Sequence, residues 1–399
     1  MTESAWLLLP SGQRAAGDFI DDTLVLRARE KGLDHRLTSL GEFPRQRVEV
    51  IRGPDLEARI NELYYRRGWT DGLPIVAPTL ERVNAALQTL SLPRDATLGE
   101  LDPLKGIASV EKVAANAVMA GCEPKHLPVV IAAVRAIASP AFNLRGVQTT
   151  DENVTPLLIL SGPDCETLEV NASFGALGPG WRGNAAIGRA LRLVMHNIGG
   201  GWPAAVSFAG LGQPGRYSLC LAENERDSPW PPLRLEHGYT LDDNVLTVMR
   251  AECVINVTGG LAELASVMGS AASAFSIAHG GKVAVCIAPY TARSLRAEGM
   301  DKAAVKRWLH EHGRIPAAEL EDLWIRRKAV EVTRWPSWVS EALESAGDGE
   351  ALVPIVATPE DIVVFVAGGD VPIAQQAYFP TWGFPDCCIS ERIAVARNR

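Results

Sequence analysis

Residues 155–201 decide the fold of this chain, and they open with the apolar run TPLLILS (155–161). A glycine-rich loop and a helical pattern follow in NASFGALGPGWRGNAAIGRALRLVMHNIGGG (171–201). The apolar run predicts a buried strand, and the apolar spacing over about 184–197 predicts an amphipathic helix that ends at the glycines 199–201. A strand, a loop and a helix in this order indicate one unit of an α/β fold.

Apolar runs and amphipathic patterns alternate on both sides of this unit. Short apolar runs predict strands over 22–27, 205–211, 246–256, 282–288, 352–357 and 362–367. Periodic apolar spacing, with capping residues such as Thr79, Ser109 and Asp301, predicts helices over 54–67, 79–90, 110–120, 124–138, 260–277, 301–312, 317–331 and 337–346. The alternation predicts an α/β class with mainly parallel sheets and flanking helices.

The length of 399 residues allows several structural units. We expect a small N-terminal element (1–50), a helix-rich α/β segment (51–150), a central α/β domain with the glycine-rich loop (151–290) and a C-terminal α/β segment (291–399). The strings LPIVAPT (73–79) and VPIVATP (353–359) match, which suggests two related α/β units. Strings this short and apolar also match by chance.

Composition narrows the classes of partner. The formal net charge is −8 and there is no block of lysine and arginine, so neither nucleic acid nor membrane is an expected partner. The N-terminus lacks the basic lead of a signal peptide. The 7 cysteines are scattered without a C-x-x-C motif, which favours reduced thiols and a cytoplasmic location. Histidine spacing indicates no dedicated metal site, and the sequence leaves the cofactor unknown.

The glycine-rich loop is the first candidate site. Glycines let the backbone approach a ligand, and a helix N-terminus presents N–H groups to an anion. Arg189 and Arg192 lie three residues apart and share one side of the helix. The alternative is a tight connection followed by a solvated helix face, because the loop has neither a Walker A nor a dinucleotide spacing. The expected substrate-binding residues are Gly178, Gly180, Arg182, Asn184 and Arg189, together with Gln148 and Thr149 ahead of the strand.

Thiols and one histidine are the candidate catalytic groups. Cys387 and Cys388 could form a redox pair, although two buried small residues would look the same in sequence. Cys122 precedes an expected helix start, which would favour the thiolate; the alternative is a core cysteine. His279, placed before an expected strand, is the best candidate for a general base. His196 is better explained as a favourable partner of the helix dipole.

Acidic residues have simpler explanations. Asp71 precedes Gly72, so a turn is favoured over a catalytic carboxylate. Residues 223–225 (ENE) begin an irregular, proline-flanked segment and are best interpreted as an exposed acidic loop, with cation or substrate binding as the alternative.

Six segments carry a resemblance to a known family: YYRRGWTDGLPIVAPT (64–79), GVQTT (146–150), ALGPGWRGNAAIGRALRLVMHNIGG (176–200), AENERDSPWPPL (222–233), VKRWLHEHGRIP (305–316) and FVAGG (365–369). The chain resembles an uncharacterised bacterial family found beside, or fused to, small proteins with a U-G-S-C (selenocysteine or cysteine) motif. Those small proteins are related to the selenoprotein B component of glycine reductase. The resemblance implies an enzyme of small-molecule, thiol or selenol redox metabolism. This chain has no C-G-S-C motif, and its tail FPDCCISERI (384–393) differs from the family's expected ending.

Three functions remain open. The first is a cytosolic enzyme, an oxidoreductase or lyase, that binds a small carboxylate or phosphate metabolite over the glycine-rich loop. The second is a thiol–disulfide redox protein that uses Cys387 and Cys388 and hands electrons to a partner protein. The third is a non-catalytic subunit of a larger complex. A homo-oligomer is compatible with each of them.

Overall fold

The computed structural model describes residues 4–8, 48–52, 54–326, 334–345, 351–383 and 388–394. Its strands are β1 (Ser4–Leu8), β2 (Val48–Arg52), β3 (Thr97–Leu101), β4 (Gly106–Ser109), β5 (Thr155–Ser161), β6 (Cys220–Ala222), β7 (Val245–Ala251), β8 (Ile255–Thr258), β9 (Val283–Ile287), β10 (Arg314–Pro316), β11 (Leu352–Pro354), β12 (Ile362–Val366), β13 (Gln375–Phe379) and β14 (Cys388–Arg392). The strand predicted at 22–27 lies outside the described residues.

The α-helices lie between these strands in the chain. They are α2 (Leu56–Arg66), α3 (Leu80–Leu87), α4 (Val110–Met119), α5 (Leu127–Ala138), α6 (Leu144–Thr149), α7 (Arg182–Asn197), α8 (Leu233–Glu236), α9 (Leu261–Met268), α10 (Ala274–His279), α11 (Pro289–Ala297), α12 (Lys302–His312), α13 (Ala317–Asp322) and α15 (Ser337–Glu344). Short 3-10 turns include η3 (Pro214–Arg216) and η5 (Pro359–Asp361).

Two four-stranded sheets form the centre of the molecule, and both are mixed. The first has the order β14-β7-β5-β6 and the second the order β12-β9-β13-β8. Only β5 with β6 and β9 with β12 run parallel; the remaining neighbours in both sheets are antiparallel. The α/β class is therefore supported, but the prediction of mainly parallel sheets is wrong. The reason is that β7 and β13 pair beside β5 and β9 in the opposite direction, an arrangement that requires no helical crossover.

The two sheets share one pairing pattern and exchange their last strands. Each contains a parallel pair, then an antiparallel strand, then an antiparallel edge strand. The chain leaves β7 to form β8 at the edge of the second sheet, and it leaves β13 to form β14 at the edge of the first. The two crossing segments pair at Ala251 and Thr381. Both sheets therefore take strands from either side of residue 290.

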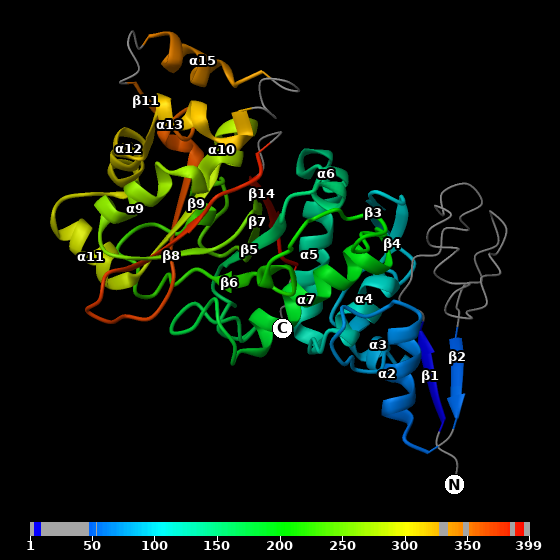
Figure 1. The fold of residues 1–399 in the computed structure, drawn as a ribbon. Coiled ribbons are helices and arrows are strands. Elements are labelled where there is room, and N and C mark those ends of the chain that lie inside the picture. The colour runs from blue at the N-terminus through cyan, green and yellow to red at the C-terminus, as the bar shows by residue number, and fades with distance from the viewer. Residues whose placement is uncertain are drawn as a thin grey trace.

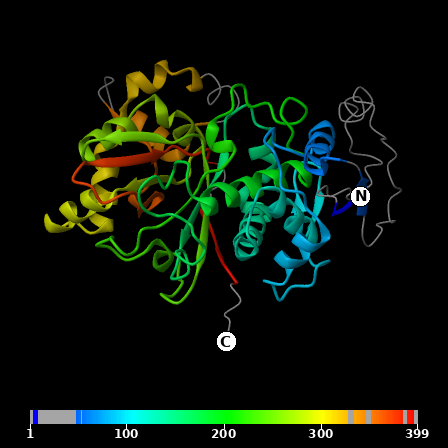
Figure 2. The ribbon, with the colours of Figure 1, turned by 90° about the horizontal axis from the view of Figure 1, so that it is seen from below.

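In each sheet, alternate side chains face a core shared by the two sheets or a core formed with the outer helices. The fold therefore has four layers, with helices outside and two sheets inside. In β5, Leu157 and Ile159 face the second sheet, whereas Leu158 and Leu160 face the helices. In β9, Ala284 and Cys286 belong to the core shared by both sheets, while Val283, Val285 and Ile287 pack against α9, α11 and α12. Figure 1 shows α4, α5 and α7 on one outer side and α9, α11 and α12 on the other. Figure 2 shows the same two helical layers from below.

Most predicted elements are confirmed, but the helix predicted over 260–277 is divided into α9 and α10, and two predicted strands need correction. Residues 205–211 form turns and bends rather than a strand, because Pro203 and the glycines 210 and 212 interrupt the run. The predicted strand over 246–256 is two strands, β7 and β8, in different sheets. The matching strings at 73–79 and 353–359 lead into α3 and η5 respectively, and neither lies in one of the two four-stranded sheets.

Two helical regions approach the length of a membrane span only as bent pairs. Within the described residues, no single helix is long and apolar enough to cross a membrane. Pro124–Ala138 with Pro140–Thr149, and Leu261–Met268 with Ala271–His279, reach that length and composition when each pair is taken together.

Candidate functional site

Helix α7 carries the residues of the largest candidate site. It packs against the outer face of the first sheet through Ile187, Ala190 and Val194. Gly188 lets it approach the chain at Ser218 closely, since a Cβ at this position would lie 3.0 Å from Ser218 Cα. The helix runs back along β5, so its last turns lie near the amino end of that strand, where Arg192 contacts Thr155.

A cavity of about 480 Å³ opens beside these last turns. Arg192 and His196 of α7 form one wall, and the loop from Pro203 to Tyr217 forms the other. We name it the arginine cavity; its lining residues are Asp71, Arg192, His196, Pro203, Ser207, Ala209, Leu211, Gly212, Gln213, Pro214, Arg216 and Tyr217. The loop segment predicted to be a strand is thus part of the cavity wall.

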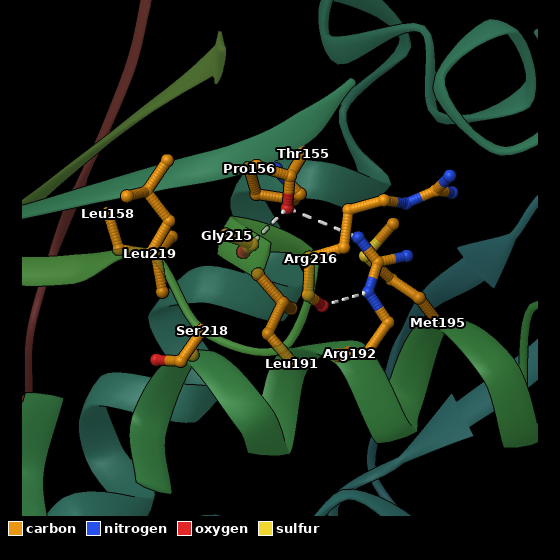
Figure 3. A pocket seen from close by; sticks show the side chains of 11 residues that line it. Thr155, Pro156, Leu158, Leu191, Arg192, Met195, Gly215, Arg216, Ser218 and Leu219 are labelled. Carbon is orange, nitrogen blue, oxygen red and sulfur yellow. Dashed lines mark hydrogen bonds between the residues drawn. The ribbon is translucent and has the colours of Figure 1, made fainter. Parts of the chain in front are cut away.

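Two arginine side chains lie next to each other in this cavity. Arg192 is buried; its Nε donates to the carbonyl of Arg216 at 2.8 Å and its Nη2 donates to Thr155 Oγ1 at 3.2 Å. Arg216 donates from Nη2 to Ser207 Oγ at 3.0 Å. Figure 3 shows Arg192 rising from α7 and Arg216 reaching across from the loop, where both also line a small void of about 10 Å³. Neither guanidinium forms an ion pair with a carboxylate in the described part of the chain.

The pKa values of both guanidinium groups in the arginine cavity are lowered. Burial lowers the pKa of Arg192, and the neighbouring charge of Arg216 lowers it further, against the opposing influence of the Asp71 carboxylate. Burial also lowers the pKa of Arg216, against the opposing influence of Glu252. A negative charge between the two guanidinium groups would oppose these effects, because an opposite charge favours the protonated form.

His196 adds a neutral imidazole to the same cavity. Burial, followed by the charges of Arg192 and Arg216, holds the pKa of His196 well below its usual range. Its ring packs against Trp202 with the ring centres 5.0 Å apart. Its Nδ1 atom is buried and has no hydrogen-bond partner within the described residues. His196 lines the cavity, whereas its Nδ1 atom is covered by other protein atoms.

The structure places the predicted anion holders outside this arrangement. Arg182 is the first residue of α7 rather than a loop residue, and it pairs with Glu123 while remaining mostly exposed. Arg189 forms two hydrogen bonds to Asp71, with Nε 2.7 Å from Oδ2 and Nη2 2.9 Å from Oδ1, and also donates to the carbonyl of Pro74. Asp71 accepts from the backbone of Leu73, as expected of a turn residue.

The glycine-rich loop lines a different cavity. Gly178 contributes to a second hollow of about 260 Å³ near the second sheet, whereas Gly180 has open space around it. Asn184 is buried and shapes the loop, donating from Nδ2 to the carbonyls of Asn171 and Ala176, both at 3.0 Å. Gln148 is buried and donates to the carbonyl of Asp102 at 2.5 Å.

The remaining candidates are dispersed. Thr149 ends α6, and its hydroxyl donates to the carbonyl of Arg145. His279 ends α10, with Phe275 and Trp382 on its sides at ring-centre distances of 6.2 and 5.6 Å. Cys387 lies outside the described residues. Cys388 begins β14, and its Sγ lies 3.8 Å from His237 Nε2.

The thiolate prediction for Cys122 is wrong. The residue follows the end of α4, and its backbone N–H bonds back to the carbonyl of Ala117. The cap position of the following 3-10 turn belongs to Glu123. Burial raises the pKa of the Cys122 thiol, against the influence of Arg189. Cys122 is thus a partly buried thiol that packs against the core.

The interpretation of residues 223–225 as an exposed acidic loop is also wrong. Glu223 and Asn224 are buried. Glu223 accepts from Ser161 Oγ at 2.9 Å and from the backbone of Leu233 at 2.8 Å, and its Oε1 lies 3.6 Å from the Lys302 ammonium. Burial raises the pKa of the Glu223 carboxyl. These polar groups fill the carboxyl end of the β5–β6 pair.

Sequence reasoning missed Arg216 altogether. Arg192 and His196 are four residues apart on one helix, so their shared face was a usable signal. The segment GQPGRYS around Arg216 contains no other charged residue and no motif. Arg216 comes next to Arg192 only through the folding of this loop. Within the described residues, no group of three or more His, Cys, Asp or Glu side chains could hold a metal ion.

Comparison with known proteins adds no relative. No protein-family model matches the chain, and neither a curated protein nor a solved structure is similar to it.

Proposed function

We propose that this chain is an enzyme that binds a small organic anion, a carboxylate or a phosphate, in the arginine cavity. The observation that carries the proposal is the pair formed by Arg192 and Arg216. Two guanidinium groups share one cavity, and neither has an ion pair among the described residues. Holding like charges together is costly, and a bound anion removes that cost through charge-assisted hydrogen bonds.

The remaining lining residues of the arginine cavity indicate the chemistry of the rest of the ligand. Pro203, Leu211, Pro214 and Tyr217 contribute apolar surface around the arginines. Leu211 is 97% exposed, so its side chain has little contact with the rest of the protein. Small-molecule sites commonly combine apolar walls with a few polar groups that fix orientation. The proposed ligand is therefore an anionic group attached to a small apolar body.

His196 is the proposed acid–base residue. Burial, followed by the charges of Arg192 and Arg216, lowers the pKa of its imidazole, so the side chain is neutral near pH 7. An anion between the arginines would offset those charges and raise the pKa toward the range useful for proton transfer. This coupling supports a lyase or oxidoreductase that removes a proton from the bound metabolite. No cofactor is assigned.

A second candidate function is thiol chemistry at Cys388. Its Sγ lies 3.8 Å from His237 Nε2, and His237 Nδ1 lies 2.5 Å from Ser390 Oγ. Thr247 Oγ1 is 2.9 Å from the same serine oxygen. A thiol beside an imidazole that a hydroxyl orients is the arrangement used to activate nucleophiles. It favours the thiol-dependent alternative over a purely structural role for Cys388.

A binding titration tests the first proposal. Isothermal calorimetry would compare inorganic phosphate, acetate, benzoate and phenyl phosphate on the full chain. For at least one of them, Arg216→Gln should weaken binding at least tenfold, since hydrogen bonds to charged groups are worth about 1.5–3 kcal/mol. Arg182→Gln removes an equally charged but exposed arginine and should leave the affinity unchanged. No binding of any probe, or the same loss in both variants, would contradict the proposal.

A further inference from the structure

The second hollow lies where the two parallel strands of the second sheet end. We name it the glycine-loop cavity; it has a volume of about 260 Å³. Ala288 follows β9, and residues 367–369 (AGG) follow β12, so the floor comes from the carboxyl ends of a parallel pair. Residues 174–178 (FGALG) cover it from the first half of the chain. The carboxyl ends of parallel strands are the usual place for ligands in α/β sheets.

The first sheet shows why this cavity is open. The last ladder pair of its parallel strands is Leu160 with Ala222, and in the second sheet it is Ile287 with Val366. The next residues in the first sheet are Ser161 and Glu223, which join a buried hydrogen-bonded network. In the second sheet they are Ala288 and Ala367. The same position is thus filled by polar side chains in one sheet and left open by alanines in the other.

The roof of the cavity is held in place by the protein itself. Asn171 donates from Nδ2 to the carbonyl of Phe174 at 2.7 Å and accepts from the backbone of Ser173 at 2.8 Å. The N–H of Gly368 donates to the carbonyl of Ala172 at 2.8 Å and joins the roof to the floor. The ring of Phe174 lies where a Cβ on Gly369 would be, so only glycine allows this contact. The cavity is therefore preformed.

The lining chemistry is uncharged. None of its lining residues carries a formal charge. Gln376 is buried, and its amide donates to the carbonyl of Gly259 at 2.9 Å and to Thr291 Oγ1 at 3.1 Å. Asn256 and Gln375 are exposed lining residues, and within the described chain their side-chain amides form no hydrogen bond. An aromatic ring, Phe174, lines the same cavity and is 62% exposed.

We propose that the glycine-loop cavity is a second binding site, for an uncharged planar ring with amide-like donors and acceptors at its edge, such as a nucleobase or a nicotinamide ring. A carboxamide offers both a donor and an acceptor, which matches the edge of such a ring. An aromatic side chain offers a face on which it can stack. The absence of charge among the lining residues makes this site distinct in chemistry from the arginine cavity.

Ligand-detected NMR with adenine and nicotinamide as probes tests the proposal, with toluene as a ring that lacks the polar edge. We expect at least one polar ring to bind the full chain and toluene to bind more weakly. The double variant Asn256→Ala, Gln375→Ala should lose at least tenfold in affinity for that ring. Both side chains are exposed, so this variant should fold.

Arg216→Gln is the matched control and should leave ring binding unchanged, whatever it does to phosphate. Binding should also be the same at low and high salt, because no charged lining residue is involved. No binding of either polar ring, equal binding of toluene, or full affinity in the double variant would overturn the proposal. Each of these outcomes is independent of the anion titration at the arginine cavity.

Discussion

At the scale of single residues, the molecule keeps two positive side chains and a neutral histidine around one cavity. Arg192 is buried beside Arg216, and both lower the pKa of His196. Most charged side chains here are neutralised locally, as Arg189 is by Asp71 and Arg234 is by Glu225. The cavity is a departure from that pattern, and perturbed groups of this kind concentrate at functional sites.

His196 should make the folded state sensitive to mild acid. Its pKa is lowered in the folded protein, so the unfolded chain takes up a proton first as the pH falls through about 6.5. Stability is then lost below pH 6.5, at up to about 1.4 kcal/mol per pH unit for one such group. Urea unfolding would measure the free energy of unfolding of the wild type and of His196→Gln at each pH. Near pH 8, that free energy should change with pH equally in both proteins. Between pH 6.5 and 5, the wild type should lose up to about 2 kcal/mol more; parallel pH profiles would show that His196 does not titrate in this way.

Helix α7 could be predicted from the sequence, but which of its side chains line the arginine cavity could not. The sequence indicated an anion beside α7 but named Arg182 and Arg189, which pair with Glu123 and Asp71. A helix repeats its faces every three to four residues, so Arg189, Arg192 and His196 could all be read as neighbours. Which of them found a carboxylate depended on the turn at Asp71 and the loop at Arg216, and these positions are set by the tertiary fold.

At the scale of elements, α7 connects both cavities. Its first turn holds the glycine-rich loop through Asn184, and its last turns carry Arg192 and His196. Gly188, between them, permits contact with the chain that leads into β6, where Ser218 Oγ donates to the carbonyl of Asn184 at 2.5 Å. The position of the arginine cavity's wall therefore depends on how closely this helix and that segment can pack.

Gly188→Ala should lower the free energy of unfolding by up to about 2 kcal/mol. Alanine in a helix is intrinsically better than glycine by about 1 kcal/mol, but here its Cβ would press on the backbone of Ser218 and Leu219, and overpacking costs about 1–3 kcal/mol. The sign of the change separates the two effects. Exposed Ala185→Gly, three residues away on α7, calibrates the propensity term and should cost about 1 kcal/mol. A stabilised Gly188→Ala protein would mean that the close approach is absent.

Elements with strong local signals were predictable, and those set by distant contacts were not. Thr79, Ser109 and Asp301 cap their helices by accepting from the backbone N–H three residues on. The strand 155–161 was read from its apolar run and matches β5. The helix predicted over 260–277 breaks at Gly269. A side chain at this position would overlap the backbone of Arg314, because an added Cβ would clash with its carbonyl oxygen. The carbonyl of Arg314 comes from a different part of the chain, so local sequence could not reveal it.

At the scale of the whole molecule, two mixed sheets share a core and are tied by exchanged edge strands. The α/β class followed from alternating apolar runs, but strand direction did not. β14 pairs with β7 across more than a hundred residues of sequence. Neither segment contains a local sequence signal that identifies the strand with which it pairs. The glycine-rich loop, from the first half of the chain, lies over the second sheet. The arginine cavity stays with the first sheet at the amino end of β5.

The most direct test of the central claim is a crystal of the full chain soaked in selenate, a tetrahedral dianion whose anomalous scattering marks its position anywhere in the molecule. We expect an anomalous difference peak in the arginine cavity, with selenate oxygens about 2.7–2.9 Å from the guanidinium nitrogens of both Arg192 and Arg216. The peak should vanish in Arg216→Gln crystals soaked in the same way. A peak over the glycine-rich loop instead, or none near Arg192, would contradict the claim.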